Sequence, residues 1–193
     1  MNYHEIFGIA APIVSFIAFA PYLKSILKGK TKPSSASWWT WTILTFVIVI
    51  SSRASGASWQ VLLLPAWLCV SQLAVSILSI KFGEKKWDLG NKICVGGAIF
   101  GILLWVLTGN ALLALGFSLL ADLFASMPNF RHVFSNPEQE DKIAWTIGWL
   151  SAVFEVLAIK NWTIASAGWA VYFILNMTVI LYFLYRRKMK YKY

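Results

Sequence analysis

The stretch ALLALGFSLLADLFASMPNF, residues 111–130, decides the fold. It is apolar over about the 20 residues that a helix needs to cross a hydrocarbon core of roughly 30 Å. One carboxylate, Asp122, lies near its middle, and one helix-breaking residue, Pro128, lies near its far end. A polar loop and a second apolar segment led by Trp145 follow. The stretch therefore predicts a membrane-spanning helix that carries an uncommon charged group.

The same order of features occurs earlier, between His4 and Thr42. A shift of 107 positions superposes the first part of each copy, and the shift drifts to 103 or 104 further along as loop lengths change. The matched pairs are Ala18 with Ala125, Pro21 with Pro128, Trp38 with Trp145, Trp59 with Trp162 and Gln72 with Asn176. We interpret this order as an internal duplication.

The composition places the chain in a membrane. Hydrophobic residues make up 59% of its 193 residues and charged residues only 13%, which is too apolar for a soluble domain of this size. The net charge of +9 would suggest nucleic acid in a soluble protein, but here the basic residues gather between apolar runs. We therefore expect contact with membrane lipid and no nucleic-acid partner. Cys69 and Cys94 lie in apolar runs without metal-ligand spacing.

Seven apolar stretches are long enough, or nearly so, to cross a bilayer as helices. They are residues 5–27, 38–52, 59–80, 92–108, 111–130, 143–158 and 162–185. Basic residues mark the cytoplasmic side of a membrane protein. With the N-terminus outside, only Arg53 and Lys160 of the 17 Lys and Arg residues lie outside. We expect an extracytoplasmic N-terminus and a cytoplasmic C-terminus in a multi-pass protein of a bacterial inner membrane.

The odd number of predicted helices explains why a single helix lies between the two copies. Three helices per copy need one inverting helix before the second copy can enter the membrane in the same direction. The predicted fold is an all-α membrane protein with parallel 3+1+3 repeats, one of the repeat schemes of transporters. Its parts are a triple-helix bundle over residues 1–82, an inversion helix over 83–110, and a second bundle over 111–193 with a basic cytoplasmic tail.

Polar and aromatic residues form a stripe on the third helix of each copy. Gln72 follows Pro65 and Cys69, and Trp169, Tyr172 and Asn176 recur at spacings of three and four. Both amides lie at matching depth, so they predict a site for a small polar solute with aromatic side chains beside it. The alternative is that the amides only bond between helices.

An ionised carboxylate inside a membrane costs free energy, so Asp122 is predicted to face a cavity or a partner group. It is interpreted either as a proton-linked or ligand-contacting carboxylate, or as a structural ion pair or hydrogen bond to a neighbouring helix. Glu155 lies near the outer end of its helix, on the side where Arg53 emerges. A gating ion pair between the two is one reading, and a solvated carboxylate is the other. Pro21 and Pro128 are expected to kink their helices as hinges of an inner gate or as static bends.

Catalytic and metal-binding patterns are missing. The sequence has no H-E-x-x-H, no G-x-S-x-G and no phosphate-binding glycine loop. We expect no enzyme activity, no metal and no cofactor. The tryptophans at helix starts, including Trp59 and Trp162, fit an interfacial aromatic belt.

The duplicated seven-helix pattern, with Pro21-Tyr22 and Pro128-Asn129 toward the inner ends of matching helices, resembles the SWEET and PQ-loop transporter superfamily. The segments PYLKSILKGKTKPSSASW and PNFRHVFSNPEQEDKIAW also resemble a bacterial seven-helix membrane family of this type. The resemblance implies that Gln72, Asn176, Trp59 and Trp162 line a solute site. The chain departs from the family pattern because the Gln of the Pro-Gln dipeptide is missing from both copies.

The function that follows as an expectation is transport of a small polar solute, such as a sugar, vitamin or amino-acid-like metabolite, by alternating access. The alternative is a seven-helix receptor or sensor of the same fold that binds a ligand without moving it. The sequence leaves open whether copies of the chain form a homo-oligomer.

Overall fold

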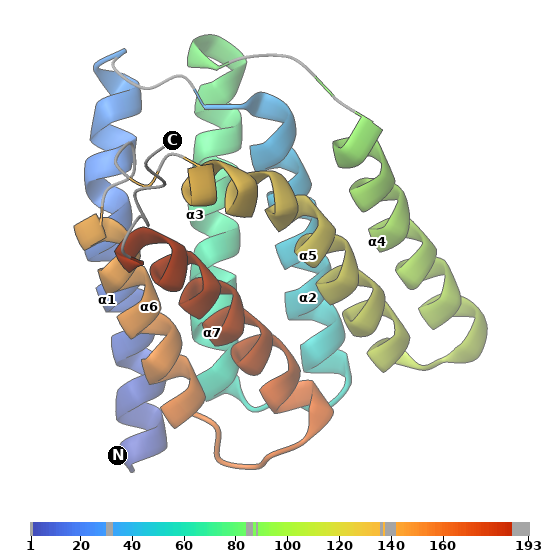
Figure 1. The fold of residues 1–193 in the computed structure, drawn as a ribbon. Helices are drawn as coiled ribbons and strands as arrows, with labels where there is room; N and C mark the ends of the chain where they lie inside the picture. The colour runs from blue at the N-terminus through green and yellow to red at the C-terminus, as the bar shows by residue number, and fades with distance from the viewer. Residues whose placement is uncertain are drawn as a thin grey trace, which may run out of the picture.

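Long α-helices make up the fold of the computed structural model (Figure 1). The structure describes residues 2–29, 33–83, 87, 89–135, 137 and 142–186, without the side chains of Ser25, Pro128, Arg131 and His132. The elements are α1 (Tyr3–Leu27), α2 (Ser35–Ala54), a 3-10 turn η1 (Trp59–Leu62), α3 (Leu63–Phe82), α4 (Leu89–Thr108), α5 (Ala111–Ser135), α6 (Lys142–Leu157) and α7 (Ile164–Tyr185). Each predicted apolar stretch thus corresponds to a helix.

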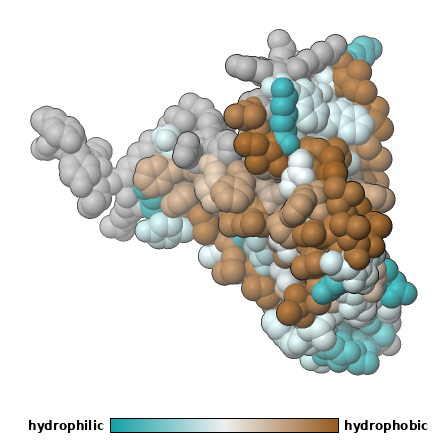
Figure 2. Space-filling model, turned by 90° about the vertical axis from the view of Figure 1, so that its right-hand side faces the viewer, coloured by the Kyte–Doolittle hydropathy of each residue, from teal (hydrophilic) through white to brown (hydrophobic). Residues whose placement is uncertain are grey.

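Length and composition make five of the helical segments in the described residues able to cross a membrane. They are Tyr3–Lys24, Ser35–Ala54, Trp59–Phe82, Leu89–Thr108 and Ile164–Tyr185, and a shorter apolar segment covers Ala111–Met127. Hydrophobic residues cover the middle of one face of the molecule, and hydrophilic residues gather at its lower end (Figure 2). The chain is therefore an all-helical protein with the surface of a multi-pass membrane protein.

Local sequence explains where several helices begin. Asn2 caps α1 through a capping box, in which its side chain accepts from the Glu5 N–H and its own N–H donates to Glu5. Ser34 caps α2 and Thr163 caps α7 in the same way, each accepting from a backbone N–H three residues later. The N-terminus and the α2–α3, α4–α5 and α6–α7 connections all lie at one end of the molecule (Figure 1).

Helix α5 is longer than the sequence predicted. We expected it to end at Phe130, but it continues to Ser135, through position 128. The extra turn is held by packing, since Val133 joins Ile180 and Leu184 of α7 in one apolar cluster. The side chain of Pro128 lies outside the described residues, and α1 runs through Pro21 without a break in the helix assignment.

Helix α4 packs against α5 and α2, and a glycine permits its closest approach. A Cβ atom at Gly101 would lie 2.9 Å from the Cβ of Phe117 and 3.2 Å from the Cα of Ala114, both on α5. Small residues at such crossings let membrane helices approach closely, since lipid offers no hydrophobic drive for association. The buried Ala98 and Ala121 continue this interface.

We expect Gly101→Ala to destabilise the protein by about 1–3 kcal/mol, because the added methyl group cannot fit between α4 and α5. The matched control is Gly96→Ala on the same helix, where a Cβ atom would meet nothing within 4 Å. That control should be neutral or slightly stabilising, since alanine favours helix over glycine. Thermal unfolding in detergent measures both variants, and equal melting temperatures would contradict the close approach.

Candidate functional site

Four polar side chains form a connected cluster between α5 and α7. The Tyr172 hydroxyl donates to Asp122 Oδ2 at 2.5 Å, and the Asn176 amide donates to the Tyr172 hydroxyl and to Ser126 Oγ, each at 3.1 Å. Asp122, Ser126 and Asn176 are buried, and Tyr172 is half-buried. The cluster therefore keeps a carboxylate, a phenol, an amide and a hydroxyl in fixed positions.

Helical spacing brings these residues together. Tyr172 and Asn176 are four residues apart, so they lie on one face of α7. Asp122 and Ser126 are also four apart and lie on one face of α5, which packs against α7. Ser118 continues the stripe toward the N-terminus of α5, and its buried hydroxyl has no hydrogen-bond partner among the described residues. This stripe presents a line of oxygen atoms to the interior.

Aromatic rings lie directly beside the cluster. Trp169 is only 5% exposed and its ring centroid lies 5.9 Å from that of Tyr172 and 5.2 Å from that of Phe173, on which it stacks. The same tryptophan packs against Ile48 of α2 and Leu115 of α5. The polar and aromatic face of α7 is therefore directed toward α2 and not toward the outside of the bundle.

The structure brings together four of the residues that we predicted for a binding site: Asp122, Trp169, Tyr172 and Asn176. Sequence reasoning missed Ser126 and Ser118. Their signal was present, because Ser118, Asp122 and Ser126 recur at a spacing of four along one helix.

Gln72 lies elsewhere, on the face of α3 that packs against α2. Its neighbours on the stripe are engaged there: Cys69 donates to the Thr42 carbonyl at 3.8 Å, and Ser76 Oγ lies 3.0 Å from Thr42 Oγ1. Gln72 is half-buried, and its buried Oε1 atom has no partner within the described part of the chain. The structure therefore shows no bond between Gln72 and the Asn176 cluster, and their pairing across one site stays a prediction.

Two tryptophans implied by the family resemblance lie apart from the cluster. Trp59 opens η1 and is 49% exposed, and Trp162 precedes α7 and is 66% exposed. Both are at the end of the molecule where the N-terminus lies. Exposed indoles at helix starts fit an interfacial aromatic belt. Their role in lining a solute site is not visible in this arrangement.

Glu155 differs from what the sequence suggested. The interpretation of a solvated carboxylate is wrong, because the side chain is 1% exposed. Arg53 is exposed, and neither carboxyl oxygen of Glu155 has a hydrogen-bond partner in the described residues. Packing explains the burial: α1 and α7 both lie against α6, and Ala158 and Ile159 are buried just beyond it. The alternative reading, an ion pair between Glu155 and Arg53, is not formed here either.

Apolar contacts close the end of the molecule that carries the N-terminus. The α2–α3 and α6–α7 connections meet in one cluster formed by Ala57, Val61, Ala158, Ile159, Ala165 and Ala170. His4 of α1 also bonds to the Leu157 carbonyl of α6 at 3.1 Å, and Phe7 contacts Phe154 at 5.3 Å between ring centroids. These contacts join α1 to α6, and the α2–α3 connection to the α6–α7 connection, at this end.

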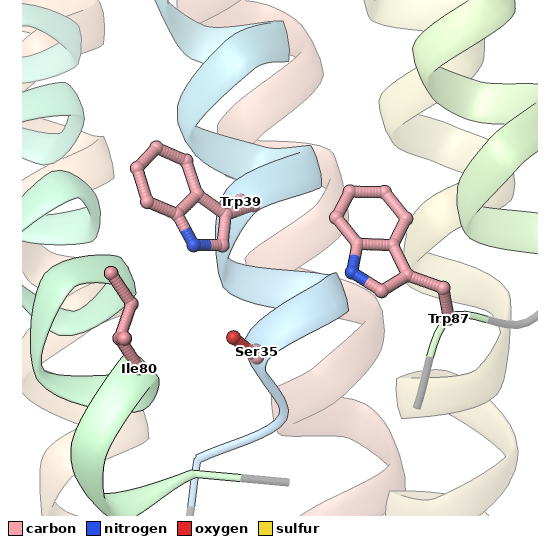
Figure 3. Close-up of a pocket in the computed structure, with 4 residues that line it drawn as sticks. All are labelled: Ser35, Trp39, Ile80 and Trp87. Atoms are coloured by element: carbon pink, nitrogen blue, oxygen red, sulfur yellow. The ribbon is translucent and has the colours of Figure 1, made fainter. Parts of the chain in front are cut away.

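A recess lies near the opposite end, between α2 and α3. Its volume is about 430 Å³, and Ser35, Trp39, Ile80 and Trp87 line it (Figure 3). The two indoles stand on either side of Ser35. None of these four residues belongs to the Asp122 cluster, so the recess is a separate surface feature.

No protein-family model, no curated protein and no solved structure matches this chain. The fold and the cluster are therefore the observations from which a function is inferred.

Proposed function

We propose that the protein carries a small polar solute across a membrane by alternating access. The observation that carries this proposal is the buried cluster of Asp122, Ser126, Tyr172 and Asn176. Polar groups at this depth of an apolar helix are costly, and they mark substrate and ion pathways in membrane proteins. Together they offer acceptors and donors for hydroxyl or amino groups, and Trp169 offers an apolar face.

The helix contacts support two bundles of three. Helix α3 packs against both α1 and α2, and α7 packs against both α5 and α6. Contacts between the bundles run from α1 to α6 and from α2 to α5. Exchanging α1 with α5 and α2 with α6, as the duplication requires, maps one of these contacts onto the other. We propose that the two bundles are parallel repeats about an axis along the membrane normal, with α4 as the inversion helix.

The closed end supplies the gate of this proposal. In alternating access, each side of a central site opens in turn while the other side stays closed. Residues of the α2–α3 and α6–α7 connections seal one side by apolar packing, which can separate without breaking ion pairs. The basic residues favour placing this side outside the cell, because Arg53 and Lys160 are the two basic residues that the sequence analysis assigns to it. Pro21 and Pro128 are the proposed hinges of the inner gate.

We expect Asn176→Ala to reduce solute uptake by about tenfold or more. The variant removes a buried amide that bonds to Tyr172 and Ser126, so both the solute contact and the geometry of the cluster are lost. The measurement has two steps. A thermal-shift screen of sugars, vitamins and amino acids on purified protein identifies ligands, and proteoliposomes then test the uptake of each ligand.

Thr178→Val is the matched control, because Thr178 lies on the same helix but accepts from Trp149 of α6. It should leave uptake within about twofold of the wild type, since it does not touch the cluster. A receptor of the same fold would bind a ligand in the thermal-shift screen and move none into the vesicles. That result would refute the carrier.

A further inference from the structure

We propose that Glu155 and Trp169 form a binding site for a positively charged amino group of the transported solute. The inference deepens the proposed function and rests on it. It begins with Glu155, a carboxyl group that is 1% exposed and whose two oxygen atoms have no hydrogen-bond partner among the described residues. Buried carboxyl groups are normally paired or hydrogen-bonded, because desolvation without a partner costs several kcal/mol.

The charge balance of the interior favours a cationic ligand. Within the described residues, Asp122 and Glu155 are the acidic or basic side chains that are buried. Arg53 and Lys160, at the same end as Glu155, are exposed. Two carboxyl groups therefore lie in an apolar interior without a buried basic side chain in the described part. A cation in that interior would be attracted to both carboxyl groups, and a neutral solute would leave them uncompensated.

Neighbouring helices do not neutralise Glu155. On α1, His4 bonds to the Leu157 carbonyl and Glu5 bonds to the Asn2 N–H. On α7, Trp169 lies close enough to interact with the Glu155 carboxyl, yet its indole N–H falls short of hydrogen-bond geometry and has no partner of its own in the described chain. The buried carboxyl group and the buried indole N–H thus lie near each other, and neither has a hydrogen-bond partner of good geometry in the described chain.

Trp169 gives the site a second property that suits an ammonium or methylated amine. Cations bind to the faces of aromatic rings, with tryptophan the strongest, within about 6 Å of the ring centroid. Trp169 and the stacked Phe173 form a small aromatic surface, and Tyr172 continues it toward Asp122. The site therefore combines a carboxyl group with aromatic rings.

The positions of the two carboxyl groups on neighbouring helices also support the proposed site. Helix α7 packs against α5 on one side and α6 on the other, so Asp122 and Glu155 approach its aromatic face from two different helices. The same face contacts Ile48 of α2. The two carboxyl groups therefore flank one surface that is turned toward the first bundle, where the proposed solute chamber lies.

The test compares amines with uncharged molecules of nearly the same shape. The pairs are ethanolamine with ethylene glycol, putrescine with 1,4-butanediol, and choline with 3,3-dimethyl-1-butanol. We expect at least one amine to raise the melting temperature of the purified full-length protein while its neutral counterpart does not. Glu155→Gln keeps the size of the side chain and one acceptor oxygen but removes the charge, and it should weaken binding of that amine by about tenfold or more.

Glu5→Gln is the control, since Glu5 is a carboxylate at the same end whose contacts are made with Asn2. It should bind the amine like the wild type. Trp169→Phe is the second site variant: it keeps a ring in the core but removes the N–H and weakens the cation–aromatic contact. It should reduce amine binding several-fold, so the proposal stays testable even where Glu155→Gln fails to fold.

Three results would overturn the amine site. They are equal stabilisation by the diols or the neutral alcohol, unchanged amine binding by Glu155→Gln, and Glu155-dependent proton uptake with no amine uptake. Transport of a neutral solute that ignores Glu155 would refute the amine site and leave the carrier intact. Failure to move any solute would refute the carrier itself, so the two failures can be told apart.

Discussion

We expect Asp122→Ala to lower solute uptake by about 30- to 100-fold, which is one of the two largest effects predicted for this protein. Hydrogen bonds to charged groups contribute about 1.5–3 kcal/mol, and each 1.4 kcal/mol changes affinity tenfold. The variant removes the acceptor of the Tyr172 hydroxyl as well as the negative charge. Tyr172 then loses its fixed position, and Asn176, which donates to it, loses an acceptor of fixed position. Uptake into proteoliposomes measures the effect.

Asp122→Asn separates charge from position. An amide oxygen can still accept from Tyr172, so this variant keeps the geometry of the cluster and removes only the charge. We expect Asp122→Asn to melt close to the wild type, because it keeps an acceptor for the Tyr172 hydroxyl, whereas Asp122→Ala leaves that hydroxyl unpaired and should be less stable. A transport defect without a loss of melting temperature would assign Asp122 to function. Unchanged uptake in both variants would exclude it from the site.

Helix positions could be predicted from the sequence because the constraint behind them is local. A backbone in lipid has to satisfy its own hydrogen bonds, so long apolar runs become helices whatever their neighbours are. Small errors occurred where packing extended a helix, as at Val133, which lies in a polar loop by sequence but buries itself against Ile180. The start of α3 also differs, since Trp59–Leu62 forms a 3-10 turn before the α-helix begins.

Three of the four hydrogen-bonded residues of the candidate site, Asp122, Tyr172 and Asn176, could be predicted from the sequence. Burying a carboxyl or an amide group in a membrane costs free energy, so Asp122 and Asn176 can each be recognised as candidate site residues without any neighbour. Ser126 cannot, because serine is common at helix contacts and becomes informative only when Asn176 is seen to bond to it. Glu155 was misjudged for a related reason. Its position near the end of the helix suggested that the carboxylate is solvated. The packing of α1 and α7 against α6 shows instead that it is buried.

The predicted symmetry of the site depends on more than depth. Gln72 and Asn176 match in the duplication, but their surroundings differ: Asn176 faces Tyr172 and Ser126, whereas the stripe of Gln72 faces Thr42 on α2. Ser15, in α1, is the residue that matches Asp122 at a shift of 107. Within the described residues the hydrogen-bonded cluster joins α5 to α7, and the positions that the proposed duplication pairs with Asp122 and Asn176 carry different side-chain chemistry.

The second large effect concerns the closed end. A reversible cross-link between Phe7→Cys and Phe154→Cys should reduce uptake to the level of protein-free vesicles. These residues join α1 to α6, one from each proposed bundle, and their rings are 5.3 Å apart. If this end has to open in every transport cycle, a covalent bridge holds the carrier in one state. The cysteines are introduced into a chain in which Cys69 and Cys94 are replaced by alanine, and a short bis-methanethiosulfonate reagent forms the bridge.

Reduction of the bridge should restore uptake, which separates closure from damage to the fold. The matched control is Phe134→Cys with Phe183→Cys, an aromatic pair of almost the same separation, 5.2 Å, that joins α5 to α7 within one bundle. Because each bundle is proposed to move as a unit, this bridge should leave most of the uptake intact. Equal inhibition by both bridges would mean that the bundles bend internally. Full uptake with a complete α1–α6 bridge would show that this end does not open during transport.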